Sequence, residues 1–151
     1  MTAAVVLIGV GNPWRRDDGV GHEVAKRATG QTTVGHDLVL CDGEPSGLVD
    51  AWTDRQLAIV VDATRGSGSP GDVRVWHDEA PTASANVTGS HALGAGHALA
   101  LGKALGRLPA RLVVVGIEID DMSHGRGLSP AVSAAVDEAV GAVVGALQAG
   151  S

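Results

Sequence analysis

The sequence contains no tyrosine, no phenylalanine and only three tryptophans. It therefore lacks the row of aromatic rings on which single-stranded nucleic acids stack. Its 11 lysines and arginines stand against 17 aspartates and glutamates, giving a formal net charge of −6. This balance argues against a partner bound through its phosphates. We expect no nucleic-acid partner.

The sequence also has a single cysteine, Cys41, which can therefore form no intramolecular disulfide. No charged and then apolar leader opens the chain, so we expect a cytoplasmic protein. No apolar run approaches the ~20 residues that a membrane span needs, so we expect no membrane partner. The motifs of serine hydrolases and of zinc sites with His-Glu-x-x-His or paired cysteines are also missing.

The most informative stretch that is present covers residues 5–21, VVLIGVGNPWRRDDGVG. Its first four residues are apolar and mostly β-branched, which is typical of a strand buried on both faces of a parallel sheet. Gly9 and Gly11 then predict a tight loop, which ends in Asp17 and Asp18. Ligands of open α/β sheets bind beyond the carboxyl ends of the strands, so this loop is placed for chemistry.

The rest of the chain alternates strand-like and helix-like segments. The predicted strands are residues 5–8, 37–41, 57–61, 73–76 and 112–117. The predicted helices are residues 19–29, 47–52, 91–105 and a last one that starts at Ser129-Pro130 and continues to residue 147. Residues 77–89 and 118–127 are predicted loops. This order indicates a single three-layer α/β domain, with a mostly parallel sheet of about five strands and helices on both faces.

Three residues form the first candidate site. Asp18 and Asp62 each follow a predicted buried strand, and His91 lies in the first turn of a predicted helix. Two carboxylates and one imidazole suit a borderline divalent ion such as nickel or zinc better than calcium. Each residue also has an ordinary explanation, as a helix cap, a turn former or a polar surface residue. The pattern alone leaves both interpretations open.

Other patterns are weaker. Asp120, Asp121 and His124 form a second group, but consecutive aspartates in a glycine-rich loop are usually solvated. Cys41 ends an apolar strand and has no identifiable base, which favours burial over nucleophilic catalysis. The glycines of residues 9–11 match a dinucleotide-binding fingerprint poorly, because the third glycine is missing.

The motifs resemble those of the hydrogenase maturation endopeptidases, which remove a C-terminal extension from the large subunit of [NiFe]-hydrogenases. The resemblance begins in the opening motif and spans nearly the whole chain, residues 1–151. It continues through DGEPSGL at 42–48, VVDA at 60–63, GSHALG at 89–94, VVGIE at 114–118 and GLSPAV at 127–132. Carried over by position, it assigns metal contact and catalysis to Asp18, Asp62 and His91. The first acid is often glutamate in the family, so the Asp18 side chain is one methylene shorter.

The resemblance also implies what the site acts on. It predicts a monomeric, aspartyl-type endopeptidase that acts on a nickel-loaded large-subunit precursor, with the nickel supplied by that precursor and no organic cofactor. The family's second loop usually reads Asp-Gly-Gly-Thr, and here it reads Asp42, Gly43, Glu44 and Pro45. We predict that Asp42, Gly43 and Glu44 bind the substrate. Two alternatives are a self-contained metal-dependent hydrolase and a noncatalytic nickel-binding assembly factor.

Overall fold

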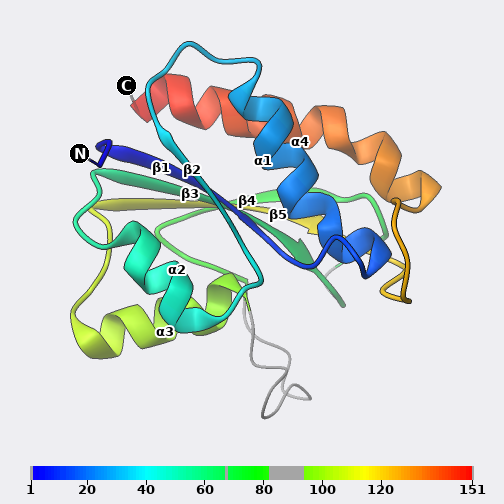
Figure 1. The fold of residues 1–151 in the computed structure, drawn as a ribbon, viewed down its shortest axis with the longest axis horizontal. Helices are drawn as coiled ribbons and strands as arrows, with labels where there is room; N and C mark the ends of the chain where they lie inside the picture. Colours follow the sequence, from blue (N-terminus) through cyan, green and yellow to red (C-terminus); the bar gives the residue numbers. More distant parts are fainter. Residues whose placement is uncertain (1, 67, 82–93, 151) are drawn as a thin grey trace.

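The computed structural model describes residues 2–66, 68–81 and 94–150 (Figure 1). The elements follow one another as β1 Val5–Val10, a 3-10 turn η1 Arg16–Gly19, α1 Val20–Thr29, β2 Asp37–Cys41, α2 Pro45–Trp52, β3 Leu57–Thr64, β4 Val73–His77, α3 Ala95–Leu105, β5 Arg111–Glu118 and α4 Pro130–Gly150. Strands and helices alternate, which confirms the predicted α/β class.

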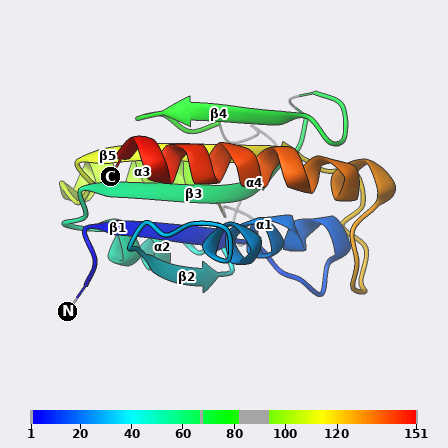
Figure 2. The same cartoon turned by 90° about the horizontal axis from the view of Figure 1, so that it is seen from above.

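The strands form one five-stranded sheet in the order β2-β1-β3-β5-β4, seen edge-on in Figure 2. Neighbouring strands are parallel, except that β4 runs antiparallel to β5 at one edge. All six residues of β1 are buried, as predicted for residues 5–8, and the strand continues through Gly9 to Val10, two residues beyond the predicted end. The carboxyl ends of β1, β3 and β5 therefore meet at the same end of the sheet.

Helices cover both faces of the sheet: α1 and α4 lie on one face and α2 and α3 on the other (Figure 1). Each pair of helices encloses its own apolar cluster against the sheet. The largest buried side chain is that of Trp52, whose Nε1 donates to the Arg107 carbonyl over 3.0 Å. The predicted three-layer arrangement is confirmed.

Helix α4 begins at Pro130, as the Ser129-Pro130 pair predicts. By length and composition it is apolar enough to cross a membrane, which the sequence reasoning did not expect of any segment. Seven of its residues are buried, and they pack in the cluster shared with α1 and the sheet. A helix that packs in the core of a folded domain can have the same length and apolar composition as a membrane-spanning helix.

Some boundaries differ from the predicted ones. Asp62 lies within β3 and not beyond it, because β3 stays paired with β5 up to Thr64 and Glu118. For the same reason Glu118 ends β5 and does not open the following loop. Helix α2 starts two residues early, at Pro45, because the Glu44 side chain caps it. The first turn of the predicted helix 91–105 lies outside the described residues, which place α3 at Ala95–Leu105.

Candidate functional site

Asp18 is held by the loop that follows β1. Its Oδ2 accepts a hydrogen bond from the Asn12 backbone N–H over 3.0 Å, across the loop. Gly11 passes so close that a Cβ there would lie 1.8 Å from the Asp18 carbonyl oxygen, and its φ is +137°. The Gly11 N–H donates to the Cys41 carbonyl at the end of β2. Glycine is required at position 11 for this tight path.

Asp62 is buried near the carboxyl end of β3, with 9% of its surface exposed. Its Oδ2 accepts a hydrogen bond of 3.0 Å from the N–H of Ala95, the first residue of α3. A Cβ on the preceding residue, Gly94, would lie 2.7 Å from the same oxygen, and its φ is +99°. The end of a strand and the start of a helix thus fix this carboxylate, which the helix N-terminus stabilises in its charged form.

Burial disfavours the charged forms of both carboxylates. The pKa of Asp62 is raised to about 7, mainly by burial and also by the negative charge of Asp18, while the Ala95 hydrogen bond lowers it. Burial also raises the pKa of Asp18, although the Asn12 amide and the charges of Arg15 and His22 oppose this. Both acids therefore resist ionisation, Asp62 partly because of its charged neighbour. A cation bound between them would offset both penalties.

His91, the third predicted member of the site, lies outside the described residues. Within residues 2–66, 68–81 and 94–150, no three histidine, cysteine or acidic side chains are grouped so that they could hold a metal. His22 lies near Asp18, but its Nε2 is hydrogen-bonded to the Cys41 carbonyl at 2.8 Å. The Cys41 thiol is half-buried, and burial raises its pKa. The described part of the chain thus contributes Asp18 and Asp62 to the candidate site.

The predicted substrate-binding loop, Asp42 to Glu44, lies against the start of α3. Asp42 Oδ1 accepts from the Glu44 N–H, and the Gly43 carbonyl accepts from the Gly94 N–H over 2.8 Å. The Glu44 carboxylate caps α2 by accepting from the backbone N–H groups of Ser46 and Gly47, each at 3.1 Å. Sequence reasoning missed this structural role of Glu44. The loop is therefore tied to the same helix end that anchors Asp62.

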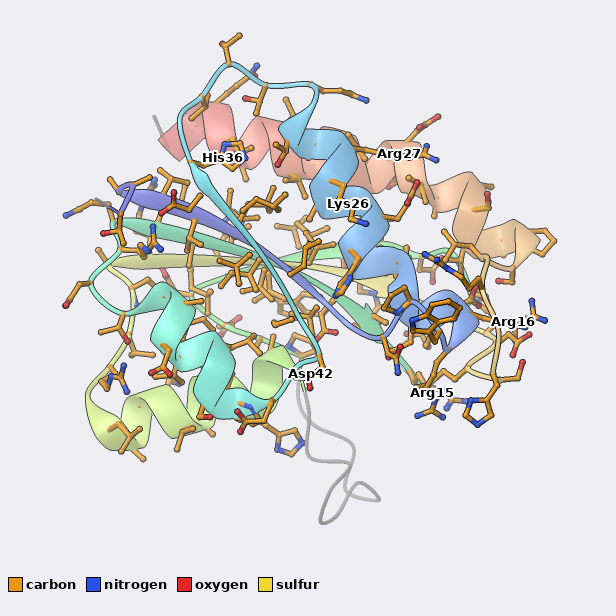
Figure 3. All side chains as sticks on the ribbon, viewed as in Figure 1. Arg15, Arg16, Lys26, Arg27, His36 and Asp42 are labelled. Atoms are coloured by element: carbon orange, nitrogen blue, oxygen red, sulfur yellow. The ribbon has the colours of Figure 1, made fainter. Side chains whose placement is uncertain are left out.

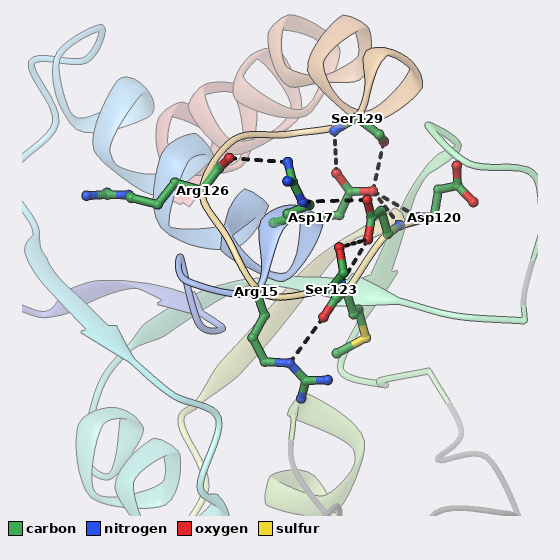
Figure 4. A network of polar contacts seen from close by, with 9 residues as sticks. Arg15, Asp17, Asp120, Ser123, Arg126 and Ser129 are labelled. Atoms are coloured by element: carbon green, nitrogen blue, oxygen red, sulfur yellow. Dashed lines mark hydrogen bonds and ion pairs between the residues drawn. The ribbon is translucent and has the colours of Figure 1, made fainter.

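Asp17 has a role that the sequence did not reveal (Figure 4). Its side chain is fully buried and accepts hydrogen bonds from the backbone N–H groups of Asp120, Asp121 and Ser129 and from the Ser129 hydroxyl. These bonds outweigh the effect of burial and lower the pKa of Asp17. The Asp17 carboxylate therefore attaches the turn η1, which also contains Asp18, to the loop after β5.

The second acidic group in the sequence belongs to that same loop, residues 119–129. Asp121 accepts from the N–H and the hydroxyl of Ser123 and lies 3.7 Å from Arg16 Nε. Asp120 and His124 are exposed, in line with the expectation of a solvated loop. Figure 3 shows Arg15, Arg16 and Asp42 toward the end of the molecule where these loops gather. The candidate site lies at this end of the sheet.

Comparison with known proteins gives the family. The sequence model named HycI, hydrogenase maturation protease, matches residues 28–146, which is more than half of the chain. The chain belongs to the hydrogenase maturation protease family. The matched segment includes Asp62 and the Asp42 to Glu44 loop, whereas Asp18 precedes it.

Two curated relatives match nearly the whole chain. The Hydrogenase 2 maturation protease of Escherichia coli (strain K12) is 26% identical over 148 residues, which cover 95% of this chain and 90% of the relative. The hydrogenase expression/formation protein HupD of Rhodobacter capsulatus is 27% identical over 152 residues, 96% of this chain and 71% of the relative. This maturation protease is therefore similar in length to the first of these relatives.

Solved structures confirm the fold of this maturation protease. The maturating endopeptidase HybD from E. coli superposes with a TM-score of 0.75 and 22% identity, covering 98% of this chain and 93% of that one. The [NiFe] hydrogenase maturation protease HybD from Thermococcus kodakarensis gives a TM-score of 0.67 and 19% identity, covering 97% and 99%.

Proposed function

We propose that this protein is a cytoplasmic endopeptidase that removes the C-terminal extension of a nickel-loaded [NiFe]-hydrogenase large-subunit precursor. The observation that carries this proposal is the pair of carboxylates at the carboxyl end of the sheet, Asp18 in the loop after β1 and Asp62 near the end of β3. Membership of the maturation protease family supports the reaction class. The resemblance of the motifs supports the position of the cut.

In the proposed reaction the nickel ion arrives as part of the substrate. Asp18 and Asp62 bind it, together with His91, and ligands from the precursor complete its coordination. Held there, the ion would supply Lewis-acid polarisation, either of the scissile carbonyl or of the attacking water. Water adds its hydroxyl to the acyl carbon and its proton to the leaving amine as the C–N bond breaks. A precursor without nickel offers the two carboxylates no cation, so binding of the ion also tests whether insertion is complete.

Two features of the site suit this transient role. Both acids have raised pKa values because of burial, so their charged forms gain most from a cation that arrives only with the substrate. In addition, the loop from Asp42 to Glu44 is hydrogen-bonded to the start of α3, where a partner polypeptide can contact it. We propose that Asp42, Gly43 and Glu44 select the precursor. In this proposal the Glu44 carboxylate both caps α2 and contributes to selection of the precursor.

The test is to incubate the purified protein with nickel-loaded and nickel-free precursor, after elemental analysis of the protein alone. Mass spectrometry should show loss of the C-terminal extension from the loaded precursor only, and the protein should carry little metal beforehand. Equal cleavage of both precursors, or a tightly bound zinc ion that activity requires, would indicate a self-contained metal-dependent hydrolase. Binding of the loaded precursor with no change in its mass would indicate an assembly factor.

A further inference from the structure

Two arginines lie at the edge of the candidate site, each three residues from one of its acids. Arg15 precedes Asp18 in the loop after β1, and Arg65 follows Asp62 at the end of β3. The charge of Arg15 lowers the pKa of Asp18, so its guanidinium lies within electrostatic range of that acid. Because 50 positions separate Arg15 from Arg65, no local sequence pattern indicates that both side chains contact the same residue.

Both guanidinium groups converge on one uncharged residue, Met122, in the loop after β5. Arg15 Nε donates to the Met122 carbonyl over 3.3 Å, and Arg65 Nη1 lies 3.3 Å from the Met122 sulfur. Within the described residues neither arginine forms an ion pair with a carboxylate. Other arginines of the described chain do form such pairs: Arg27 with Glu23, Arg55 with Asp37 and Arg107 with Asp50.

Two guanidinium groups that contact the same residue repel one another, and an anion bound between them would offset this repulsion. The bond from Nε to Met122 turns the Arg15 side chain so that its terminal nitrogens face away from the network, as Figure 4 shows. Arg65 is exposed, and its guanidinium rests on a thioether, which is a weak acceptor. The planar guanidinium fork matches a carboxylate with two parallel hydrogen bonds.

Within the described residues the nearby acids form no ion pair with either arginine, although the charge of Arg15 acts on Asp18. Asp17 is buried and saturated by backbone and hydroxyl donors, and Asp121 is bonded to Ser123 and lies beside Arg16. Asp120 is exposed, but it forms no ion pair within the described residues. The edge of the site therefore presents positive charge immediately beside the two acids that are proposed to bind a cation.

We infer that Arg15 and Arg65 form a carboxylate-binding site for the polypeptide substrate, beside Asp18 and Asp62. This inference rests on the proposed function for the identity of the partner, a precursor polypeptide, and on the geometry alone for the carboxylate. The protein then recognises two features of its substrate: Asp18 and Asp62 bind a cation, and Arg15 and Arg65 bind a carboxylate. That carboxylate belongs either to an acidic side chain near the cut or to the end of the extension.

The first test uses peptides as probes and measures the Nε–Hε NMR signals of the arginines. Acetyl-tetraglutamate amide should shift the signals of Arg15 and Arg65, and acetyl-tetraglutamine amide should not. Acetyl-tetraglutamine with a free C-terminal carboxylate separates the two sources: shifts with this peptide assign the site to a chain end, and shifts with the glutamate peptide alone assign it to side chains. Unchanged Arg15 and Arg65 signals with all three peptides would overturn the inference.

Variants make the test specific. Arg65→Gln, at an exposed position, should weaken binding of the carboxylate peptide by about tenfold, the loss expected for a charge-assisted hydrogen bond. The matched control Arg27→Gln removes the same charge from exposed α1 and should leave binding unchanged. Equal affinities of the wild-type protein and Arg65→Gln would contradict the inference.

The second test separates this inference from the proposed function. With nickel-loaded precursor, Arg65→Gln should raise KM by about tenfold and leave kcat nearly unchanged, because the lost contact binds the substrate and not the transition state. Peptide binding at Arg15 and Arg65 without cleavage of any precursor would overturn the proposed function and keep the carboxylate site. Cleavage by the wild-type protein with an unchanged KM in Arg65→Gln would overturn the carboxylate site alone.

Discussion

Replacing Asp62 with asparagine should stabilise the protein at alkaline pH and abolish its activity. The pKa of Asp62 is raised from 3.8 to about 7, first by burial and then by the charge of Asp18. An acid whose pKa is higher in the folded state binds more protons when folded. The free energy of unfolding therefore falls as the pH rises from the unfolded pKa to the folded one, and the loss is complete above about pH 8.

The size of the effect follows from the shift. The rise from 3.8 to about 7 is about three units, and each unit corresponds to about 1.36 kcal/mol, so charging Asp62 costs the folded state up to about 4 kcal/mol. Asparagine has nearly the same shape, and its amide oxygen can still accept the Ala95 hydrogen bond. We expect Asp62→Asn to be more stable than the wild-type protein by up to about 4 kcal/mol at about pH 8.5 but by only about 1.5 kcal/mol at about pH 5, where the loss has just begun.

The assay is urea unfolding at both pH values, followed by the fluorescence of the buried Trp52. The control Asp137→Asn lies on the exposed face of α4 and should keep the pH dependence of the wild-type protein. If the stabilities of the wild-type protein and Asp62→Asn change in parallel from about pH 5 to 8.5, Asp62 is not a strained acid in the folded protein. Mass spectrometry of the precursor should show no cleavage by Asp62→Asn at either pH.

Three further predictions concern the residues around this acid. Asp18→Ala should leave the fold intact and the precursor uncleaved on electrophoresis, whereas Cys41→Ser should still process it. Asp17→Ala should lower the free energy of unfolding by about 3 kcal/mol or more in urea titrations, because it leaves buried donors without an acceptor. The lowered pKa of Asp17 places its contribution above the unfolded pKa, so that stability is lost as the pH falls through the folded pKa. Gly94→Ala should reduce cleavage at least tenfold, since its Cβ would press on the Asp62 carboxylate at a φ that alanine rarely adopts.

A specific result would contradict each of these three predictions. Normal processing by Asp18→Ala would remove it from the site, and loss of processing in Cys41→Ser would give the thiol a role. A wild-type urea midpoint for Asp17→Ala would mean that water replaces the lost acceptor. Full activity of Gly94→Ala would show that the start of α3 can shift without affecting Asp62.

Much of the fold could be predicted because each strong local pattern agreed with the final packing. The apolar run of β1 and the Ser129-Pro130 start of α4 needed no partner to be recognised. The end of β3 could not be found in this way. Asp62 and Ala63 are not typical strand residues, and they stay in the sheet because β5 pairs with β3 as far as Glu118, 54 positions beyond Thr64.

In the candidate site, too, contacts between residues far apart in the sequence could not be predicted from local patterns. Asp17 and Asp18 are identical neighbours in the sequence, yet one is a buried anchor and the other faces the candidate site. The difference arises from Ser129, which lies 112 positions after Asp17 and binds only that carboxylate. The convergence of Arg15 and Arg65 on Met122 depends on equally distant contacts. The sequence could predict that Asp18 and Asp62 share one end of the sheet, but not which side chains support them.

Two consecutive amides at the start of α3 serve different parts of the site. The Gly94 N–H is bonded to the Gly43 carbonyl, and the Ala95 N–H is bonded to the Asp62 carboxylate. Because these groups share one short piece of backbone, a partner that displaces the Gly43 loop also moves the donor that favours the charged form of Asp62. The coupling is reciprocal by thermodynamic necessity: if binding at the loop makes Asp62 more acidic, ionised Asp62 strengthens binding at the loop by the same factor. Partner binding at the Gly43 loop and ionisation of Asp62 are then thermodynamically linked. A change in the Asp62 pKa on binding therefore measures the change in partner affinity on ionisation.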